Sequence, residues 1–328
     1  MSCEHKDLCV HHPHTSRLRV IFDWKNCPEA NPDGMGIWLY PVDNPNTYIY
    51  RDLSRNGGYI EVPDGEYNIL CYNNDSETLL LSGTRNFDSH VGFTRTGGAL
   101  EGASLGPMAN TTVRANGAED ERVVICVDEI WGCNATNVSI YNGEVGYTCY
   151  PEESATEPTH IFNEERTITL YPTDVVCHYS YEIKRVTWAK YMTNACGTLS
   201  GMAAHYYFAD GALGDEQVTL PFATSYEPLE EYPNDMRLFG EFLTFGHHES
   251  NEKAHKMMIY VWRPGVGGNC YAEFDVTDQV DQAPNKRRVH IVIDLLELTD
   301  IIDPTTGGGF EVIVPDFIPV PEIIIPMG

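Results

Sequence analysis

Hydrophobic and polar residues alternate along most of this chain with the period of two that is typical of half-buried β-strands. In the segment 17–24 an apolar residue stands at every second position, from Leu18 to Trp24. Near the other end, Val289, Ile291 and Ile293 place one apolar face on the segment 288–298. The pattern therefore predicts a protein built mainly from strands.

The predicted strands cover residues 17–24, 36–42, 59–62, 66–72, 122–130, 166–171, 175–186, 237–245, 256–263, 271–276 and 288–298. The turn sequence Pro63-Asp64-Gly65 separates the third of these from the fourth, so we expect those two to pair as a hairpin. Helical signals are weak and are confined to a turn or two at 198–204 and at 277–282.

Many short strands, frequent Gly and Pro and no β–α alternation predict an all-β protein with two consecutive antiparallel β-sandwich domains and few short helices. A polar stretch bracketed by prolines, 150–159, lacks any periodicity and marks the expected boundary. We therefore predict a tether over 1–16, an N-terminal domain over 17–160 and a C-terminal domain over 161–328. The last of these ends in an apolar tail, 307–328.

The chain of 328 residues carries 48 acidic and 21 basic side chains, a net charge of −27. Because nucleic-acid binding depends on Lys and Arg that neutralise phosphates, this balance excludes nucleic acid as an expected partner. The longest apolar runs are far shorter than the roughly 20 residues of a spanning helix, so any membrane attachment should be through lipid.

A near-terminal cysteine, Cys3, precedes a polar stretch, 4–14, and then the first predicted strand. This order is typical of a bacterial lipoprotein, in which the acceptor cysteine becomes the first residue after signal cleavage and carries the acyl chains. Met1 and Ser2 would then be remnants of a leader. The alternative is a cysteine that lies near the start by chance.

The chain contains ten cysteines, and nine remain if Cys3 is acylated, so they cannot all pair. No C-x-x-C occurs, and the spacings match no zinc or redox pattern. Cys126, Cys133 and Cys149 are close enough in sequence for one local bridge, although the connectivity is not determined by sequence.

Several short segments have residue patterns that are similar to those of one family. They are 196–204, 218–222, 243–246, 274–280 and 289–293 in the second half, and Cys3–Cys9 and Val20–Trp24 near the start. In these segments the chain resembles the fimbrillin-type anchor and cell-adhesion lipoproteins of Bacteroidales fimbriae.

The resemblance implies two transthyretin-like β-sandwich domains, a lipid anchor in the outer membrane and exposure on the cell surface. It further implies a role in holding or terminating a fimbrial polymer, with other fimbrial subunits as partners and neither catalysis nor a cofactor. Base, stalk and tip positions remain open, and a tip would bind a host or bacterial surface ligand. The short distance from Cys3 to the first strand favours an untrimmed anchor, although Arg17 and Arg19 allow proteolytic trimming.

The C-terminal tail begins with a glycine hinge, 307–309, and continues as an apolar segment interrupted by four prolines. The residues that would form a donor strand are Phe310, Val312, Val314, Phe317, Val320, Ile323 and Ile325. Inserted into a neighbouring subunit, such a tail would add a strand through main-chain hydrogen bonds and fill pockets with alternate side chains. The alternative is that the tail lies along its own domain as a terminal edge strand.

Catalytic motifs of hydrolases, metalloproteases and nucleotide-binding enzymes do not occur in the sequence, so no enzymatic activity and no metal or cofactor are expected. Two histidine groups could bind a transition metal: residues 5–14, with four histidines, and His247, His248 and His255. Because neither group has a fixed ligand spacing, we expect both to lie in solvated loops.

The aromatic content, with 19 tyrosines and five tryptophans, allows a different function. Flat rings on a surface-anchored β-sandwich would suit a glycan-binding module, because they cover the apolar faces of sugars. Trp24, Trp38, Tyr67 and Trp188 lie in strand patterns, however, where core packing is the simpler interpretation.

Overall fold

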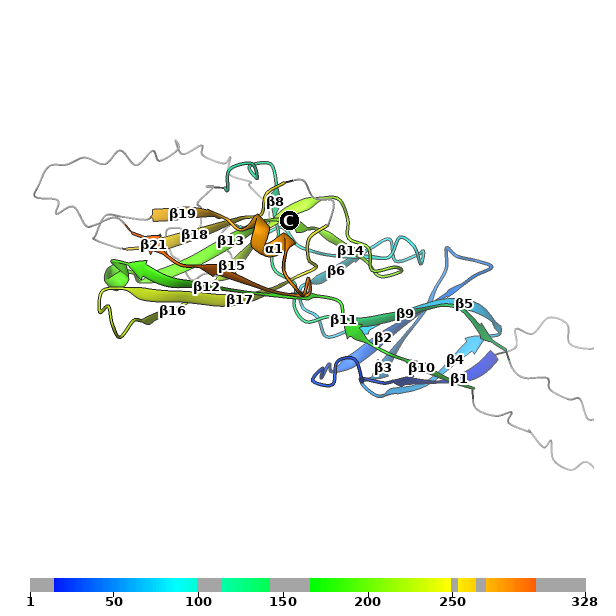
Figure 1. The fold of residues 1–328 in the computed structure, drawn as a ribbon. Helices are drawn as coiled ribbons and strands as arrows, with labels where there is room; N and C mark the ends of the chain where they lie inside the picture. The colour runs from blue at the N-terminus through cyan, green and yellow to red at the C-terminus, as the bar shows by residue number, and fades with distance from the viewer. Residues whose placement is uncertain (1–14, 99–113, 142–165, 249–252, 264–269, 299–328) are drawn as a thin grey trace, which may run out of the picture.

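The computed structural model describes residues 15–98, 114–141, 166–248, 253–263 and 270–298. These residues form strands almost throughout, arranged as two lobes that lie end to end (Figure 1). The prediction of an all-β sandwich fold with few short helices is confirmed. The described part of the chain contains no helix with the length and apolar character of a membrane span.

The first lobe is one eight-stranded sheet in the order β10-β1-β4-β3-β2-β5-β9-β11. Its strands are β1 (Thr15–Phe22), β2 (Gly34–Pro41), β3 (Ile49–Ser54), β4 (Gly57–Pro63), β5 (Gly65–Asn73), β9 (Trp131–Ile140), β10 (Arg166–Leu170) and β11 (Thr173–Asp174). The sheet curls until β10 approaches β9, where the Arg166 guanidinium donates to the carbonyl of Ser139 at 2.8 Å. The curled sheet encloses a core of buried side chains that includes Val20, Ile37 and Ile69.

The alternation seen in the sequence explains how β1 is positioned in this sheet. Its even-numbered residues are buried and its odd-numbered residues are exposed or half-buried, as expected for a strand with one face on a core. The predicted hairpin is wrong, however, because β4 pairs with β1 and β3 while β5 pairs with β2 and β9. Pro63-Asp64-Gly65 is instead a corner, stabilised by the Ser16 hydroxyl, which donates to the Asp64 carboxylate at 2.6 Å.

The second lobe is a sandwich of two five-stranded sheets, one in the order β16-β17-β12-β20 with β21 beside β12, the other in the order β19-β18-β13-β15-β8. The bounds of the strands in the first of these sheets are β12 (Cys177–Thr187), β16 (Ser225–Pro228), β17 (Met236–Thr244), β20 (Arg288–Ile293) and β21 (Leu296–Glu297). Those of the second are β8 (Arg122–Val123), β13 (Asn194–Ala203), β15 (Gln217–Ala223), β18 (Lys256–Trp262) and β19 (Cys270–Asp275). Phe222 of one sheet stacks on Phe242 of the other, with ring centroids 4.6 Å apart.

A small third sheet, β14-β7-β6, lies between the lobes and joins the two halves of the sequence (Figure 1). It consists of β6 (Leu79–Ser82), β7 (Val91–Thr94) and β14 (His205–Tyr207). Strand pairing also crosses the predicted boundary at residue 160 in both directions, because β10 and β11 belong to the first sheet and β8 pairs with β15. The division into domains 17–160 and 161–328 stays a prediction. Each lobe contains strands from both sides of residue 160.

Two further details differ from expectation. The sheets are mixed rather than purely antiparallel, since β1 and β10, β12 and β20, and β8 and β15 run parallel. The segment 198–204 is not helical: its apolar residues belong to β13, which is buried almost throughout. The helix expected at 277–282 is present as α1 (Thr277–Asp281), and a short 3-10 helix at Ala189–Tyr191 follows β12.

The two ends of the described chain lie at opposite poles of the molecule (Figure 1). Thr15 begins β1 at the outer end of the first lobe, paired with Pro63. Leu296 and Glu297 form β21 at the outer end of the second lobe, paired with Val186 and Thr187. The first and last described strands are therefore separated by the full length of the molecule.

Gly57 allows a direct test of the packing between β4 and β1. Its φ is +96°, and an added Cβ would lie 2.0 Å from the carbonyl oxygen of Val20. We expect Gly57→Ala to lower the free energy of unfolding by about 2–4 kcal/mol, from strain at positive φ plus overpacking. Urea unfolding measures the loss.

Gly117→Ala is the matched control for this variant. Gly117 also has a positive φ, +85°, but a Cβ there would have no neighbour within 4 Å. We expect it to lose about 1 kcal/mol, the conformational part alone. Equal losses in the two variants would contradict the described contact between β4 and β1.

Candidate functional site

A buried aromatic seam joins the two lobes and fixes how their surfaces meet. It consists of Tyr40, Leu70, Tyr72, Phe87, Val127, Ile130, Val175, Val176, Phe208 and Phe245. Tyr72 of β5 stacks on Phe208, which follows β14, with ring centroids 4.4 Å apart. The amide of Asn134 on β9 donates to the carbonyls of Phe208 and Ala209 at 3.2 and 3.0 Å. Residues from both halves of the sequence thus form one packed unit.

His90 lies at the centre of this seam with no exposed surface. Its Nδ1 is 2.6 Å from the Tyr40 hydroxyl, and its Nε2 is 2.9 Å from the Tyr72 hydroxyl. The Tyr40 hydroxyl donates its proton to the carbonyl of Thr84 at 2.9 Å, so Nδ1 must carry the proton that joins His90 to Tyr40. The Tyr72 hydroxyl then donates to Nε2, and the ring is neutral with both nitrogens satisfied.

Burial also determines the ionisation of this network. Desolvation lowers the pKa of His90 to about 4, because the apolar surroundings disfavour the imidazolium. The pKa of Tyr72 is raised for the same reason, with a smaller contribution from Tyr40. The network is therefore a set of neutral hydrogen bonds at physiological pH.

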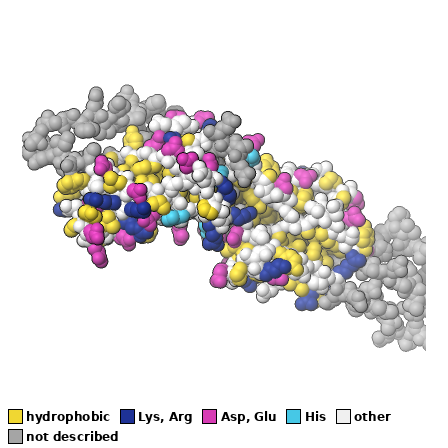
Figure 2. Space-filling view, viewed as in Figure 1, with side chains coloured by type: hydrophobic (Ala, Val, Ile, Leu, Met, Phe, Trp, Pro, Cys, Tyr) yellow, Lys and Arg dark blue, Asp and Glu magenta, His cyan; other side chains and the backbone are white. Residues whose placement is uncertain are grey.

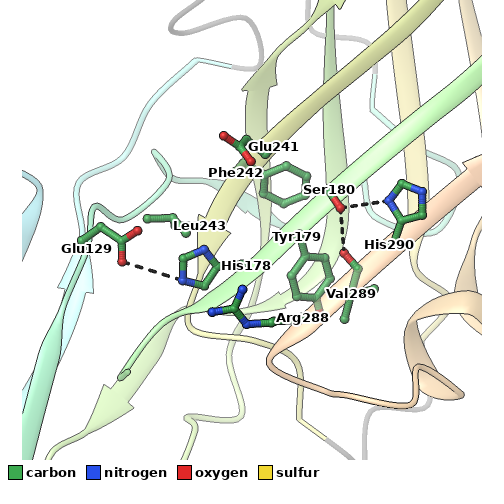
Figure 3. Close-up of a pocket in the computed structure, with 10 residues that line it drawn as sticks. All are labelled: Glu129, His178, Tyr179, Ser180, Glu241, Phe242, Leu243, Arg288, Val289 and His290. Atoms are coloured by element: carbon green, nitrogen blue, oxygen red, sulfur yellow. Dashed lines mark hydrogen bonds and ion pairs between the residues drawn. The ribbon is translucent and has the colours of Figure 1, made fainter. Parts of the chain in front are cut away.

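A groove of about 410 Å³ opens on the outer face of β12, β17 and β20 (Figure 3). Its lining is mostly polar: Glu129, His178, Tyr179, Ser180, Glu241, Phe242, Leu243, Arg288, Val289 and His290. Glu129 comes from the connection between β8 and β9 and faces His178. The Nε2 atom of His178 lies 3.8 Å from the carboxylate of Glu129. Burial raises the pKa of Glu129, and the charge of His178 partly opposes that shift. Donors and acceptors of both signs thus meet in one groove.

Ser180 and His290 form a close pair in this groove, with Oγ 2.9 Å from Nδ1 (Figure 3). The nearby carboxylate of Glu182 is bonded to Arg237 at 2.6 Å, and this bond lowers the pKa of Glu182. Ser180 lies on β12, which is paired on one side with β17 and on the other with β20. The main-chain N–H groups of β12 are therefore used in hydrogen bonds within the sheet. Among the described residues no carboxylate is bonded to His290 and no main-chain donors are directed at Ser180, whereas a serine hydrolase uses both. The groove is suited to binding a polar segment or ligand.

Basic side chains gather beside the constriction between the lobes, against the acidic balance of the whole chain (Figure 2). Lys286, Arg287 and Arg288 lie at the start of β20, and the Arg287 guanidinium donates to the carbonyl of Asp174. This bond connects the second lobe to the last strand of the first sheet. The basic segment therefore helps to hold the junction.

The seven described cysteines carry free thiols. Cys71 on β5 lies directly opposite Cys133 on β9, and burial raises the pKa of the Cys71 thiol. Cys126 and Cys133 are not bridged to each other. Cys149, the third member of the suggested local set, lies outside the described residues.

The expectation that His247 and His255 lie in solvated loops is wrong. His247 is 8% exposed and His255 is 1% exposed, and both face the carboxylate of Asp281. Of the described residues, these three form the group whose ligand atoms could hold a metal ion. Sequence spacing could not find them, because the third member comes from α1. The N-terminal histidines lie outside the described residues.

The exposed tyrosines give limited support to a sugar-binding surface. Cations cover the faces of several: Arg17 lies over Tyr59 at 4.3 Å, and Lys25 over Tyr171 at 3.8 Å. Trp24 is buried in the first core, which agrees with the core interpretation of its strand pattern. Trp188 is different, being 43% exposed at the outer end of the second lobe.

The residues proposed for lipidation and strand donation cannot be placed. Cys3 and the tail residues Phe310, Val312, Val314, Phe317, Val320, Ile323 and Ile325 all lie outside the described residues. The structure does place the strands next to them, at the two poles of the molecule.

A sequence profile for a family described as a domain of unknown function, DUF5119, matches residues 2–223. The chain belongs to this family. The match includes the whole first lobe and the bridging sheet, together with β8, β12, β13 and β15 of the second lobe.

Relatives of this DUF5119 chain agree with the resemblance found in its sequence. A Bacteroides ovatus protein named as a candidate fimbrium anchoring subunit, Fim4B, is 25% identical over 92 residues, which are 28% of this chain and 27% of that protein. The chain is thus aligned with about a quarter of that relative's length.

Solved structures support the fold of the DUF5119 chain. A candidate adhesin from Bacteroides ovatus matches with a TM-score of 0.59 and 18% identity, over 93% of this chain and 99% of that one. The fimbrial anchor protein Mfa2 of Porphyromonas gingivalis is more distant, at a TM-score of 0.48 and 13% identity over 85% and 91% of the two chains. The adhesin match shows that the whole fold, with both lobes, occurs in another protein.

The buried His90 should make the stability of the DUF5119 chain depend on pH. Its folded pKa of about 4 lies below the ordinary histidine pKa of 6.5, so the unfolded state binds the proton more readily. The stabilisation is fully present above pH 6.5 and is lost as the pH falls to about 4, a change of about 3 kcal/mol. Urea unfolding at several pH values measures it.

His90→Gln isolates this contribution from the many carboxylates. The variant should be less stable than wild type at neutral pH, and the difference should shrink as the pH falls from 6.5 to 4. A constant difference across that range would show that His90 is not held neutral in the fold.

Proposed function

We propose that this chain is a non-enzymatic subunit of a cell-adhesion fimbria, held at the outer membrane and exposed on the cell surface. The observation that carries the proposal is that the first and last described strands lie at opposite ends of the molecule. β1 starts at one pole, and β21 lies at the other. A subunit that connects a membrane to a polymer needs its two attachments at opposite ends. The stretch shared with the fimbrium anchoring relative supports the same role.

Lipid attachment at Cys3 would place the membrane at the pole of the first lobe. Eleven positions, 4–14, separate this cysteine from β1. Two acyl signals hold a protein stably on a bilayer, whereas one chain alone gives reversible binding. The negative charge of the whole chain would not by itself attract it to an anionic membrane surface, so the lipid would have to provide the attachment.

Strand donation by the tail is the proposed link to a neighbouring subunit. The tail follows β21, at the pole opposite the start of β1. The edges of the second lobe could receive a strand in turn. Among the described strands β19 pairs only with β18, and β16 only with β17. The edge of β20 is partly covered, because the Gln279 side chain bonds both main-chain groups of Val292 at 2.7 and 3.0 Å.

A tip adhesin or glycan-binding module is the second candidate, favoured by one observation. Trp188 lies at the outer pole with 43% of its surface exposed, in a left-handed conformation with φ of 57°. Strained residues of this kind concentrate at binding sites. Binding on a glycan array that is lost in Trp188→Ala but kept in Tyr59→Ala would favour this function over the anchor.

The lipid anchor is tested in the native host with the natural leader present. We expect Cys3→Ala to abolish metabolic lipid labelling and to release fimbriae into the medium, because the variant lacks the thiol that would carry the acyl chains. Counting cell-bound and shed fimbriae measures the effect, and Cys9→Ala is the matched control. Normal lipid labelling of Cys3→Ala, or fimbriae that stay attached without the lipid, would remove the anchor role.

Strand donation is tested by comparing substitutions on the two alternate faces of the tail. Val312→Asp with Val314→Asp should reduce co-purification with other fimbrial subunits by at least about tenfold, because charged side chains would have to enter apolar pockets. Glu311→Gln, on the alternate face, should have little effect. Normal incorporation after removal of residues 310–328 from a folded protein would rule out donation.

A further inference from the structure

Three segments that are separate in the sequence meet at α1 in the second lobe. His247 follows β17 after a turn at Gly246, whose φ is +106° and whose carbonyl accepts the N–H of Ala203 at 2.9 Å. His255 directly precedes β18, and its N–H donates to the Thr277 hydroxyl at 2.9 Å. Asp281 is the last residue of α1. Main-chain bonds therefore hold two of the three side chains at fixed positions.

The hydrogen bond of His255 determines which of its ring nitrogens faces the carboxylate. Nδ1 lies 3.1 Å from the carbonyl oxygen of Ser200, which can only accept, so Nδ1 carries a proton. In the neutral ring Nε2 then presents a lone pair, and it lies 3.6 Å from the Asp281 carboxylate. Two acceptors that face each other in a buried site repel unless a positive charge lies between them.

His247 is oriented in the same way. Its Nδ1 lies 3.1 Å from the Tyr179 hydroxyl, which turns Nε2 toward Asp281 at 3.6 Å. The two imidazole rings are 5.0 Å apart, centroid to centroid, and inclined at 75°. Histidines that ligate metals usually bond their second nitrogen to a carbonyl or another polar group, as both histidines do here.

The spacing fits a shared ion better than direct hydrogen bonds. A distance of 3.6 Å is too long for a charge-assisted bond between nitrogen and oxygen. Two ligands bound about 2.0–2.1 Å from a tetrahedral ion lie about 3.4 Å apart. The three ligand atoms all lie within 4.8 Å of one another, and the half-exposed Asp281 side chain can move to close the remaining gap.

We propose that His247, His255 and Asp281 bind one divalent ion of the zinc type. Two imidazoles and one carboxylate suit zinc and its first-row neighbours, whereas calcium and magnesium prefer all-oxygen sites. Solvent reaches the site on the side of Asp281, so water supplies the fourth ligand. The ion links the end of β17, the start of β18 and α1, and so stabilises this end of the lobe.

The test uses the full chain without a histidine tag, with His5, His11, His12 and His14 replaced by Asn so that they cannot compete. After chelation and dialysis, calorimetry with Zn²⁺ should give one site per chain with a micromolar or tighter Kd. Co²⁺ should give visible absorption bands typical of low coordination. Zn²⁺ should also raise the Tm.

Asp281→Asn and His255→Asn should each weaken Zn²⁺ binding by more than about 100-fold, since even outer-shell partners of metal sites contribute 10–100-fold. Asn at position 255 can keep a donor toward Ser200, and circular dichroism checks the fold of both variants. His290→Asn, an exposed histidine of the same lobe, is the control and should bind normally. Absence of stoichiometric binding in the parent, or unchanged binding in a folded Asp281→Asn protein, would overturn the proposal.

Discussion

The packing of the aromatic seam between the lobes is the interaction on which the rest of the structure depends. Tyr72 and Phe208 stack across it, and His90 packs edge-on against both rings, 5.6 Å from each centroid and without exposed surface. A buried imidazole is tolerated only when both nitrogens are satisfied, and the hydroxyls of Tyr40 and Tyr72 satisfy them. These hydrogen bonds hold the segment before β7 against β2 and β5, and the stacking of Tyr72 on Phe208 joins that arrangement to the residues after β14.

Strand exchange makes this alignment difficult to lose. The first sheet takes β10 and β11 from beyond residue 160, and the second lobe takes β8 from before it. Separating the lobes would expose the seam and would also break the pairing of β14 with β7 in the bridging sheet. Two lobes connected only by a linker would move relative to each other, whereas exchanged strands make one elongated unit.

An elongated unit of this kind suits a position between a membrane and a polymer. A pulling force applied at the two poles would pass through the curled sheet, the bridging sheet and the sandwich. Membership of the DUF5119 family places the chain among related sequences, and the adhesin from Bacteroides ovatus shares the fold over nearly its whole length. The fimbrial role proposed above therefore needs no catalytic site, and the groove on β12 is available for contact with a partner or ligand.

Local patterning along the chain predicts the class of the fold and the position of many of its strands. The pattern of apolar and polar residues is a local property, so the strands β1, β17 and β18 and the short helix α1 could all be predicted from neighbouring residues. The family resemblance was also readable from short segments. By contrast, the partners of each strand are set by contacts between distant residues. The sequence Pro63-Asp64-Gly65 is compatible with a hairpin, but the curled sheet makes it a corner.

The chemical groups that come together are set by packing between distant parts of the chain. His247 and His255 read as polar loop residues, since nothing local shows that Asp281, Tyr179 and the carbonyl of Ser200 surround them. His90 carries no motif, yet burial from both lobes makes it neutral and central. Alternation reports which face of a strand is buried, whereas the environment of a single side chain depends on elements that pack against it from elsewhere in the chain.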